Sequence, residues 1–173
     1  MQRRGNDWTL RPVNAECNSD LGFLYGILMR RLREPHTNIS HQQLPKWDDH
    51  VSFVQSKPYW VHYLVGWGRF SVGVCYIDHY GHVGIYISPE FRRCGAGSWV
   101  LDRLIEEHRE TPLRANINPL NSASIALFQS KGFKHIEDSS DIQITLRRSL
   151  NDERATSATI MDRRAGAAVN GDA

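Results

Sequence analysis

The chain lacks the features of a membrane-spanning, secreted or metal-stapled protein. No apolar run approaches the roughly 18 residues needed to cross a bilayer, and residues 1–7 are polar, without the apolar core of a secretory signal. The three cysteines, Cys17, Cys75 and Cys94, form no Cys-x-x-Cys pair and are odd in number, so neither a disulfide framework nor a structural zinc site is expected. We therefore expect a cytoplasmic protein in a reducing compartment, with no membrane partner.

A strong charge of either sign is also missing. The 21 Lys and Arg against 19 Asp and Glu give a formal net charge of +2, too little to indicate nucleic acid as a partner. A length of 173 residues suits one domain with its own core. We expect residues 1–7 to be flexible and 8–150 to fold. Residues 151–173 contain no aromatic residue, and we expect a disordered tail there, or alternatively a loosely docked helix over 153–164.

Hydrophobic periodicity predicts alternating strands and helices. Helical spacing of apolar residues indicates helices over 20–32, 47–54, from about 97 to before Pro112, and over 122–131. Short apolar runs between turns indicate strands over 8–13, 59–65, 70–78, 82–87, 113–117 and 142–146. The order β-α-α-β-β-β-α-β-α-β, with short turns between 59 and 87, predicts a mixed α/β fold. Its sheet should be largely antiparallel and flanked by helices, unlike a doubly wound nucleotide fold.

A basic, glycine-containing loop joins the strand over 82–87 to the next helix. It reads Arg92-Arg93-Cys94-Gly95-Ala96-Gly97-Ser98. The first turn of a helix has unpaired N–H groups and a positive dipole end, and Gly95 and Gly97 leave room for close approach. Amides from Arg93 to Ser98 could therefore wrap a pyrophosphate. The loop is neither a Walker nor a Rossmann loop. A plain strand-to-helix turn is the alternative.

This loop and a second segment resemble the two cofactor motifs of the GNAT family of acetyltransferases. The first motif reads Arg/Gln-x-x-Gly-x-Gly/Ala in the family, and residues 92–97 match it. The second is an Asn, then a helix with a small residue and an aromatic, closed by Gly-Phe; residues 121–133 resemble it. The two motifs cover 83–133 in the family's order, and the element order extends the resemblance over about 8–146.

The resemblance implies the GNAT acyl-CoA N-acyltransferase fold, acetyl-CoA as the acetyl donor, no metal, and direct attack by an amine in a ternary complex. Backbone groups of residues 85–87 would meet the pantetheine arm where strands splay near a bulge, and an N–H near Ile87 would stabilise the oxyanion. Asn121 would bond the pantetheine or cap its helix. The cofactor residues so implied are Ile85, Tyr86, Ile87, Arg92, Arg93, Cys94, Gly95, Ala96, Gly97, Ser98, Asn121 and Phe128.

Two departures from the family's pattern leave the acid and the base open. Many members carry a Tyr in the second-motif helix as general acid, and Phe128 stands there in this chain. Many also carry a glutamate on the preceding strand, but residues 114–118 include no carboxylate. Either another group protonates the thiolate or the thiolate leaves unaided.

Histidine is the natural alternative base, because it titrates near neutral pH. Strand alternation puts His82, Gly84 and Tyr86 on one face, so His82 and Tyr86 are catalytic candidates, as is Glu34. The alternatives are a surface role for His82 and core packing for Tyr86.

The polar segment 33–41 lies where the family usually builds its acceptor pocket. Glu34, His36 and His41 are candidates for binding an amine or hydroxylated acceptor, unless the segment is a solvated loop. We expect a small-molecule primary amine such as an amino sugar. A protein or nucleic-acid base is an alternative acceptor, and a non-catalytic coenzyme A-binding sensor or assembly module is an alternative function. A homodimer is left open.

Overall fold

Two antiparallel sheets form the framework of the computed structural model, which describes residues 7–34, 43–136 and 143–149. The first contains β1 (Trp8–Pro12), β2 (Val61–Trp67), β3 (Phe70–Ile77) and β4 (Val83–Ile87), in that order. The second contains β5 (Arg114–Ile117), β7 (Ile144–Arg148) and β6 (Phe133–His135), in that order. The predicted meander is confirmed, because β2, β3 and β4 pair antiparallel along the chain. The expected disordered tail over 151–173 lies outside the described residues.

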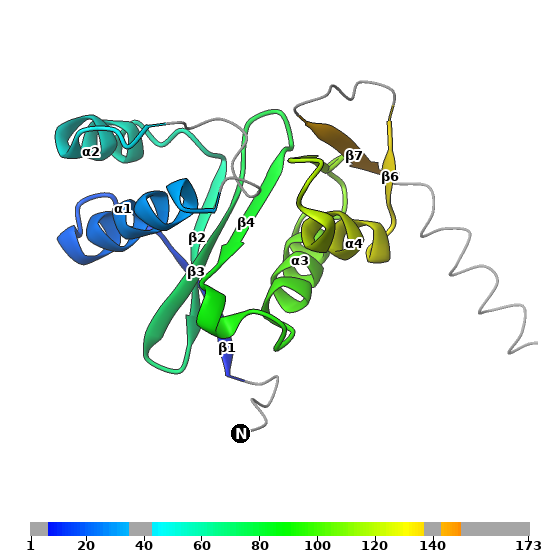
Figure 1. Cartoon of the computed structure of the whole chain (residues 1–173), viewed down its shortest axis with the longest axis horizontal. Helices are drawn as coiled ribbons and strands as arrows, with labels where there is room; N and C mark the ends of the chain where they lie inside the picture. Colours follow the sequence, from blue (N-terminus) through cyan, green and yellow to red (C-terminus); the bar gives the residue numbers. More distant parts are fainter. Residues whose placement is uncertain (1–6, 35–42, 137–142, 150–173) are drawn as a thin grey trace, which may run out of the picture.

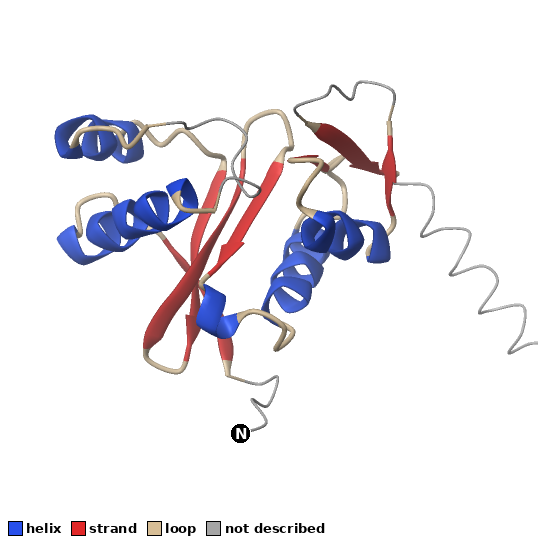
Figure 2. Ribbon diagram, viewed as in Figure 1, coloured by secondary structure: helices blue, strands red, loops and turns tan. Residues whose placement is uncertain are grey.

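Helices cover both faces of the four-stranded sheet (Figures 1 and 2). α1 (Asn18–Leu32) and α2 (Trp47–Gln55) lie on one side, and α3 (Ala96–Glu107) and α4 (Ser122–Ser130) lie on the other. The mixed α/β fold expected from the sequence is therefore present. No helix in these ranges is long and apolar enough to span a membrane.

Strand β4 lies between two hydrophobic cores. Its odd-numbered residues Val83 and Ile87 join the larger core, beneath the fully buried Val100 and Leu104 of α3. Tyr86 points the other way, into a smaller core with residues of α1. Alternation along one strand thus anchors it on both faces.

The structure contains one strand more than the sequence predicted. β6 has three residues and pairs with β7, which begins two residues later than expected. A three-residue strand is too short to show alternation, so periodicity did not indicate it.

The two sheets meet at the start of β4 and then diverge. His82 and Arg114 form an isolated parallel bridge, and the Arg114 N–H donates to the Gly81 carbonyl at 2.9 Å. Beyond it, β4 pairs with β3 and β5 pairs with β7. The facing edges of β4 and β5 therefore open apart. The register shift found in the first sheet lies between Val65 and Gly66 of β2, rather than at this opening.

His62 on β2 is enclosed next to a stacked pair of tyrosines, Tyr59 and Tyr76. Its ring centroid lies 4.9 Å from that of Tyr59, and the two tyrosine rings lie 4.1 Å apart. Burial lowers the pKa of His62 to about 4.

We expect this histidine to make the fold less stable in acid. Between about pH 6.5 and about pH 4 the unfolded chain binds a proton at His62 that the folded chain does not, so stability falls as the pH falls. Between about pH 7 and pH 5 the loss should be about 1–2 kcal/mol in the free energy of unfolding. Urea titrations of wild type and His62→Gln should show a smaller loss in the variant. His79→Gln removes an exposed imidazole and should match wild type; equal losses in wild type and His62→Gln would contradict the assignment.

Candidate active site

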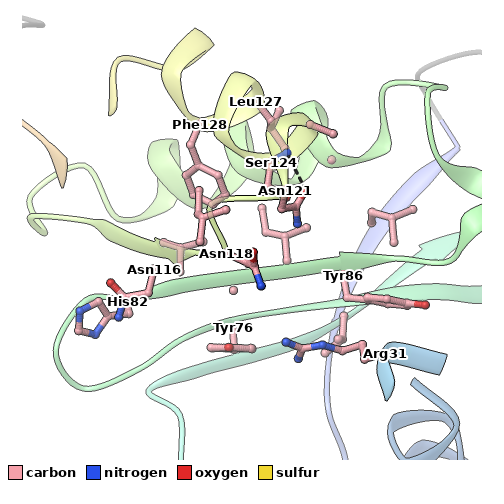
Figure 3. A pocket seen from close by; sticks show the side chains of 18 of the residues that line it. Arg31, Tyr76, His82, Tyr86, Asn116, Asn118, Asn121, Ser124, Leu127 and Phe128 are labelled. Carbon is pink, nitrogen blue, oxygen red and sulfur yellow. Dashed lines mark hydrogen bonds between the residues drawn. The ribbon is translucent and has the colours of Figure 1, made fainter. Parts of the chain in front are cut away.

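A cavity of about 730 Å³ occupies the opening between β4 and β5 and reaches both faces of the first sheet. On the α1 side it is lined by Arg31 and Tyr76, and on the other side by Gly97 of α3 and Leu127 of α4. Figure 3 shows the side chains of α4 above the strand and those of Tyr76 and Arg31 below it. Groups bound on opposite sides of the sheet could therefore meet within one cavity.

The loop after β4 forms a cup of backbone amides. After the short 3-10 turn Pro89–Phe91, Arg93 and Gly95 adopt left-handed φ angles of 58° and 87°. The first helical bond of α3 runs from the Trp99 N–H to the Gly95 carbonyl at 2.9 Å, and no side chain caps the helix. The N–H groups of residues 96–98 therefore point out of the helix end, where its dipole is positive.

The space in front of this cup is open. A Cβ atom added at Gly95 would meet no described atom within 4 Å. At Gly97 the added atom would lie 3.2 Å from Cδ2 of Leu127, so glycine lets the first turn of α3 approach α4 closely. The donors and the room match an anionic group such as a diphosphate.

The free edge of β4 presents backbone groups of Ile85 and Ile87 to the cavity. The Ser88 N–H donates to the Val72 carbonyl at 2.8 Å, which fixes the even-numbered residues of β4 as those that bond to β3. In an antiparallel pair the intervening residues point their N–H and C=O groups to the opposite edge. An extended chain could therefore lie along β4 and pair with residues 85 and 87 as an added strand would.

Arg92, the first arginine of the loop, turns away from the amide cup. Its Nε donates to the Ile87 carbonyl at 2.8 Å, and its Nη2 donates to both carboxylate oxygens of Glu34, at 3.1 and 2.8 Å. The guanidinium lies over the Tyr86 ring, 5.3 Å from its centroid. Arg92 thus ties the end of β4 to Glu34, two residues beyond the end of α1, and both Arg92 and Arg93 line the cavity.

His82 lies at one end of the cavity, and Asp78 holds its ring. Nδ1 of His82 is 3.0 Å from Oδ2 of Asp78, and Oδ1 of Asp78 accepts from the N–H groups of Tyr80 and His82 at 2.8 and 2.9 Å. Burial acts to raise the pKa of Asp78, but these hydrogen bonds outweigh it and lower the pKa. A carboxylate only accepts, so Nδ1 carries the proton and Nε2 of the neutral ring keeps its lone pair.

Tyr86 is largely enclosed by the smaller core. The residue is 7% exposed, and burial raises the pKa of its hydroxyl. The ring of Tyr76 instead lies over the middle of β4, so close to Gly84 that a Cβ atom added there would collide with it. The face shared by residues 82, 84 and 86 is therefore covered at its centre by a residue of β3.

Helix α4 contributes an amide and an apolar wall. Oδ1 of Asn121 accepts from the Ser124 N–H at 3.1 Å, so Asn121 caps α4 and also lines the cavity. Phe128 is buried and packs edge-on against Phe133 at 5.0 Å between centroids. It supplies no acidic proton to the cavity.

The remaining candidates lie at the edge of the site or outside the described residues. Cys94 donates from Sγ to the Phe91 carbonyl at 2.6 Å, and Ala96 is buried under the loop. Glu34 is held in its ion pair with Arg92, and His36 and His41 lie outside the described residues. Among residues 7–34, 43–136 and 143–149, no three His, Cys, Asp or Glu side chains gather as a metal site would require.

The sequence analysis missed several residues that line the cavity. Asp78 could have been found, since the run Asp-His-Tyr-Gly-His places two partners four residues apart across a tight turn. Arg31, Tyr59 and Tyr76 come from three separate elements or turns, and nothing local in the sequence links them. The further lining residues that were missed are Val74, Val83, Asn116, Ile117, Asn118, Ala123, Ser124, Leu127 and Gln143.

The sequence pattern of the acetyltransferase (GNAT) family matches residues 21–133, which span the first helix, the β4 edge, the amide cup and α4. The chain belongs to this family. It is accordingly an acetyl-CoA-dependent acetyltransferase, as the two motifs predicted. No curated protein matches the chain.

Solved structures share the fold at low sequence identity. One is yncA of Salmonella typhimurium, solved with its cofactor acetyl-CoA: 18% identity, 85% of this chain and 96% of that chain, TM-score 0.67. A ribosomal-protein-alanine N-acetyltransferase of Brucella melitensis is 19% identical, the match covers 81% of this chain and 98% of that chain, and the TM-score is 0.65. A phosphinothricin acetyltransferase of Sinorhizobium meliloti, solved with acetyl-CoA, is 20% identical. The match covers 82% of this chain and 88% of that chain, with a TM-score of 0.65.

Replacing Gly95 by glutamate should weaken coenzyme A binding by about 100-fold, because a carboxylate would stand in front of the amide cup. Gly95→Ala is the matched control: both variants bear the left-handed strain of about 1–2 kcal/mol, but only one adds charge. Calorimetric titration measures the affinity of each variant for coenzyme A, and thermal melts check that each variant folds. Equal affinities of the two variants would show that the cup does not seat the diphosphate.

Proposed function

We propose that this enzyme transfers the acetyl group of acetyl-CoA to the primary amine of a small molecule, by direct attack in a ternary complex. One observation carries the proposal. A single cavity connects the amide cup and the open edge of β4 with the His82–Asp78 pair. Its volume of about 730 Å³ falls within the range of small-molecule sites.

Three parts of the chain fit the donor, which supplies an activated acetyl thioester when bound. The amides of residues 96–98, with Arg93 beside them, would hold the diphosphate. The N–H of Ile87 and the C=O of Ile85 would pair with the amides of the pantetheine arm. Asn121 keeps its side-chain N–H₂ for the same arm while its oxygen caps α4. The fold is shared with two structures that contain acetyl-CoA, which supports this placement.

His82 is the base in this proposal. Its Nε2 would accept the proton that the amine loses as the new C–N bond forms, and Asp78 would orient the ring and stabilise the imidazolium. The Ile85 N–H, at the open edge and nearer to His82 along β4, would stabilise the charge on the carbonyl oxygen. Because Phe128 has no hydroxyl, the thiolate would leave without a proton from that helix, which the acidity of a thiol permits.

The cysteines support a mechanism without a covalent enzyme intermediate. Cys75 is fully buried, and burial raises the pKa of its thiol to about 12. Cys94 donates to the Phe91 carbonyl, and Cys17 lies at the start of α1, where its Sγ is 3.1 Å from Oγ of Ser19. None of the three lines the cavity. Initial-rate plots should therefore intersect, whereas the parallel lines of a ping-pong reaction would argue against direct attack.

Coenzyme A release from acetyl-CoA, measured with a panel of amines that includes amino sugars, tests the function. A mass increase on one amine would identify the product. Binding of coenzyme A without turnover of any amine would favour the sensor, and acetylation of a protein N-terminus in preference to every small amine would favour a protein acceptor.

His82→Gln should lower kcat by about 100-fold or more while leaving the affinity for acetyl-CoA unchanged, because it removes a general base but no part of the cup. Asp78→Asn should lower kcat by a smaller factor, again without a change in acetyl-CoA affinity, since it acts through the orientation of His82. His79→Gln in the same turn is the matched control and should behave like wild type. Normal kcat in His82→Gln would remove His82 from the mechanism.

A further inference from the structure

Asn116 on β5 lines the end of the cavity at which His82 lies. The bridge between His82 and Arg114 fixes the start of β5 beside the start of β4, and Asn116 is the second residue beyond it. Its neighbours Ala115 and Ile117 join the larger core. Because side chains alternate along a strand, Asn116 points away from that core, as His82 does on β4. Both side chains line the cavity, and Figure 3 shows them at the same end of it.

Thr145 of β7 fixes the side-chain amide of Asn116. The two residues are direct cross-strand partners, and Oγ1 of Thr145 donates to Oδ1 of Asn116 at 3.1 Å. Thr145 is buried, so this bond is held within the second sheet. An amide carries its acceptor and its donors on different atoms. With the oxygen engaged by Thr145, Nδ2 is the group that Asn116 offers to the cavity.

The wall of the cavity around Asn116 is neutral. It is built from side-chain amides of the second sheet and of the start of α4, namely Asn116, Asn118, Asn121 and Gln143. Asp78 is the one carboxylate among the cavity-lining residues that the structure describes, and it lies with His82 where β4 begins. A ligand carboxylate or phosphate would lose its water against neutral amides in this wall, so a hydroxyl or carbonyl oxygen is the better match.

We propose that Asn116 selects acceptors that carry a neutral oxygen, a hydroxyl or a carbonyl, close to the amine. The oxygen accepts a hydrogen bond from Nδ2 of Asn116 while the nitrogen faces Nε2 of His82. This inference rests on the proposed transfer and names the substrate class. Thr145 is a positioning residue in this arrangement, because it acts through the amide of Asn116.

The spacing of the two side chains limits the distance between the nitrogen and the oxygen of the acceptor. Asn116 lies two residues along β5 from the bridge at His82, and two residues of a strand span about 7 Å. Each side chain extends toward the ligand from its own strand, so the nitrogen and the oxygen should be roughly two to four bonds apart. Vicinal amino alcohols, amino sugars and amides of small amino acids meet this condition, whereas simple alkylamines do not.

Pairs of amines that differ by one oxygen-bearing group test the proposal. The pair trans-2-aminocyclohexanol and cyclohexylamine tests a hydroxyl, and the pair leucinamide and 3-methylbutylamine tests a carbonyl. Each amine would be titrated calorimetrically into the protein saturated with coenzyme A, which measures binding without turnover. For at least one pair, wild type should bind the oxygen-bearing member about fivefold more tightly, the size of one neutral hydrogen bond. The pair that shows this preference identifies the kind of oxygen.

Variants of Asn116 and Thr145 assign the preference to the amide. Asn116→Ala should reduce it to within about twofold, because no N–H₂ group remains. Thr145→Val keeps the branched shape but removes the hydroxyl that holds the amide, and it should lower the preference by about twofold or more. Thr145→Ser keeps a hydroxyl and is the matched control, so it should retain the preference. Comparing the same two amines in every variant cancels their different basicities.

The outcomes separate the inference from the proposed function. No preference in wild type, binding by neither member of either pair, or a preference that survives in Asn116→Ala overturns the inference. A preference lost in Asn116→Ala but unchanged in Thr145→Val overturns the role of Thr145. Coenzyme A affinity and thermal melts confirm that each variant folds, and Asn116→Ala decides the inference even if Thr145→Val does not fold.

Coenzyme A release from acetyl-CoA, measured with the same amines, reports on the transfer itself. Turnover of these amines with no dependence on Asn116 overturns the inference alone. An Asn116-dependent binding preference without turnover of any amine overturns the transfer alone.

Discussion

The site depends on one strand edge that the fold leaves without a partner. Backbone N–H and C=O groups are rarely left unpaired inside a protein, and the exposed edge of a strand readily accepts another extended chain. β4 is paired along one edge with β3, and on the other edge it touches β5 at a single bridge before the two diverge. The strand is held on both faces, because its side chains pack into separate cores, Ile87 with residues of α3 and Tyr86 with residues of α1. Arg92 then occupies the last carbonyl of the edge with its own side chain.

Two polarised features converge on that edge from opposite sides of the sheet. The left-handed turn at Arg93 and Gly95 sets the first amides of α3 toward one end of the cavity, and the tight turn after β3 sets Asp78 against His82 at the other. The proposed transfer would use dipoles and one imidazole, with the reacting groups held close together by the opening between the sheets.

Most of the fold and the amide cup could be predicted from the sequence, because both are encoded locally. Helical and strand periods gave the elements, and the glycine-containing run of residues 92–97 encodes the left-handed turn that presents the first amides of α3. The residues at the other end of the cavity could not be predicted in the same way. The position of α1 decides whether Arg92 faces the cup or Glu34. Alternation along β4 placed Tyr86 and His82 on one face, but it could not show that the smaller core would enclose Tyr86. Arg31 and Tyr76 meet only through the packing of α1 on the sheet, which has no short-range signature.

The crossing of Tyr76 over Gly84 has a consequence for how such enzymes diverge. The ring fills the volume that any side chain at position 84 would need, so residues 76 and 84 cannot both have large side chains there. A relative that replaces this glycine by a larger residue must move or shorten the side chain of residue 76. The aromatic ring would then no longer cover the middle of β4, and the new side chain would line the cavity there. Substrate preference and the size of these two residues should therefore change together during evolution.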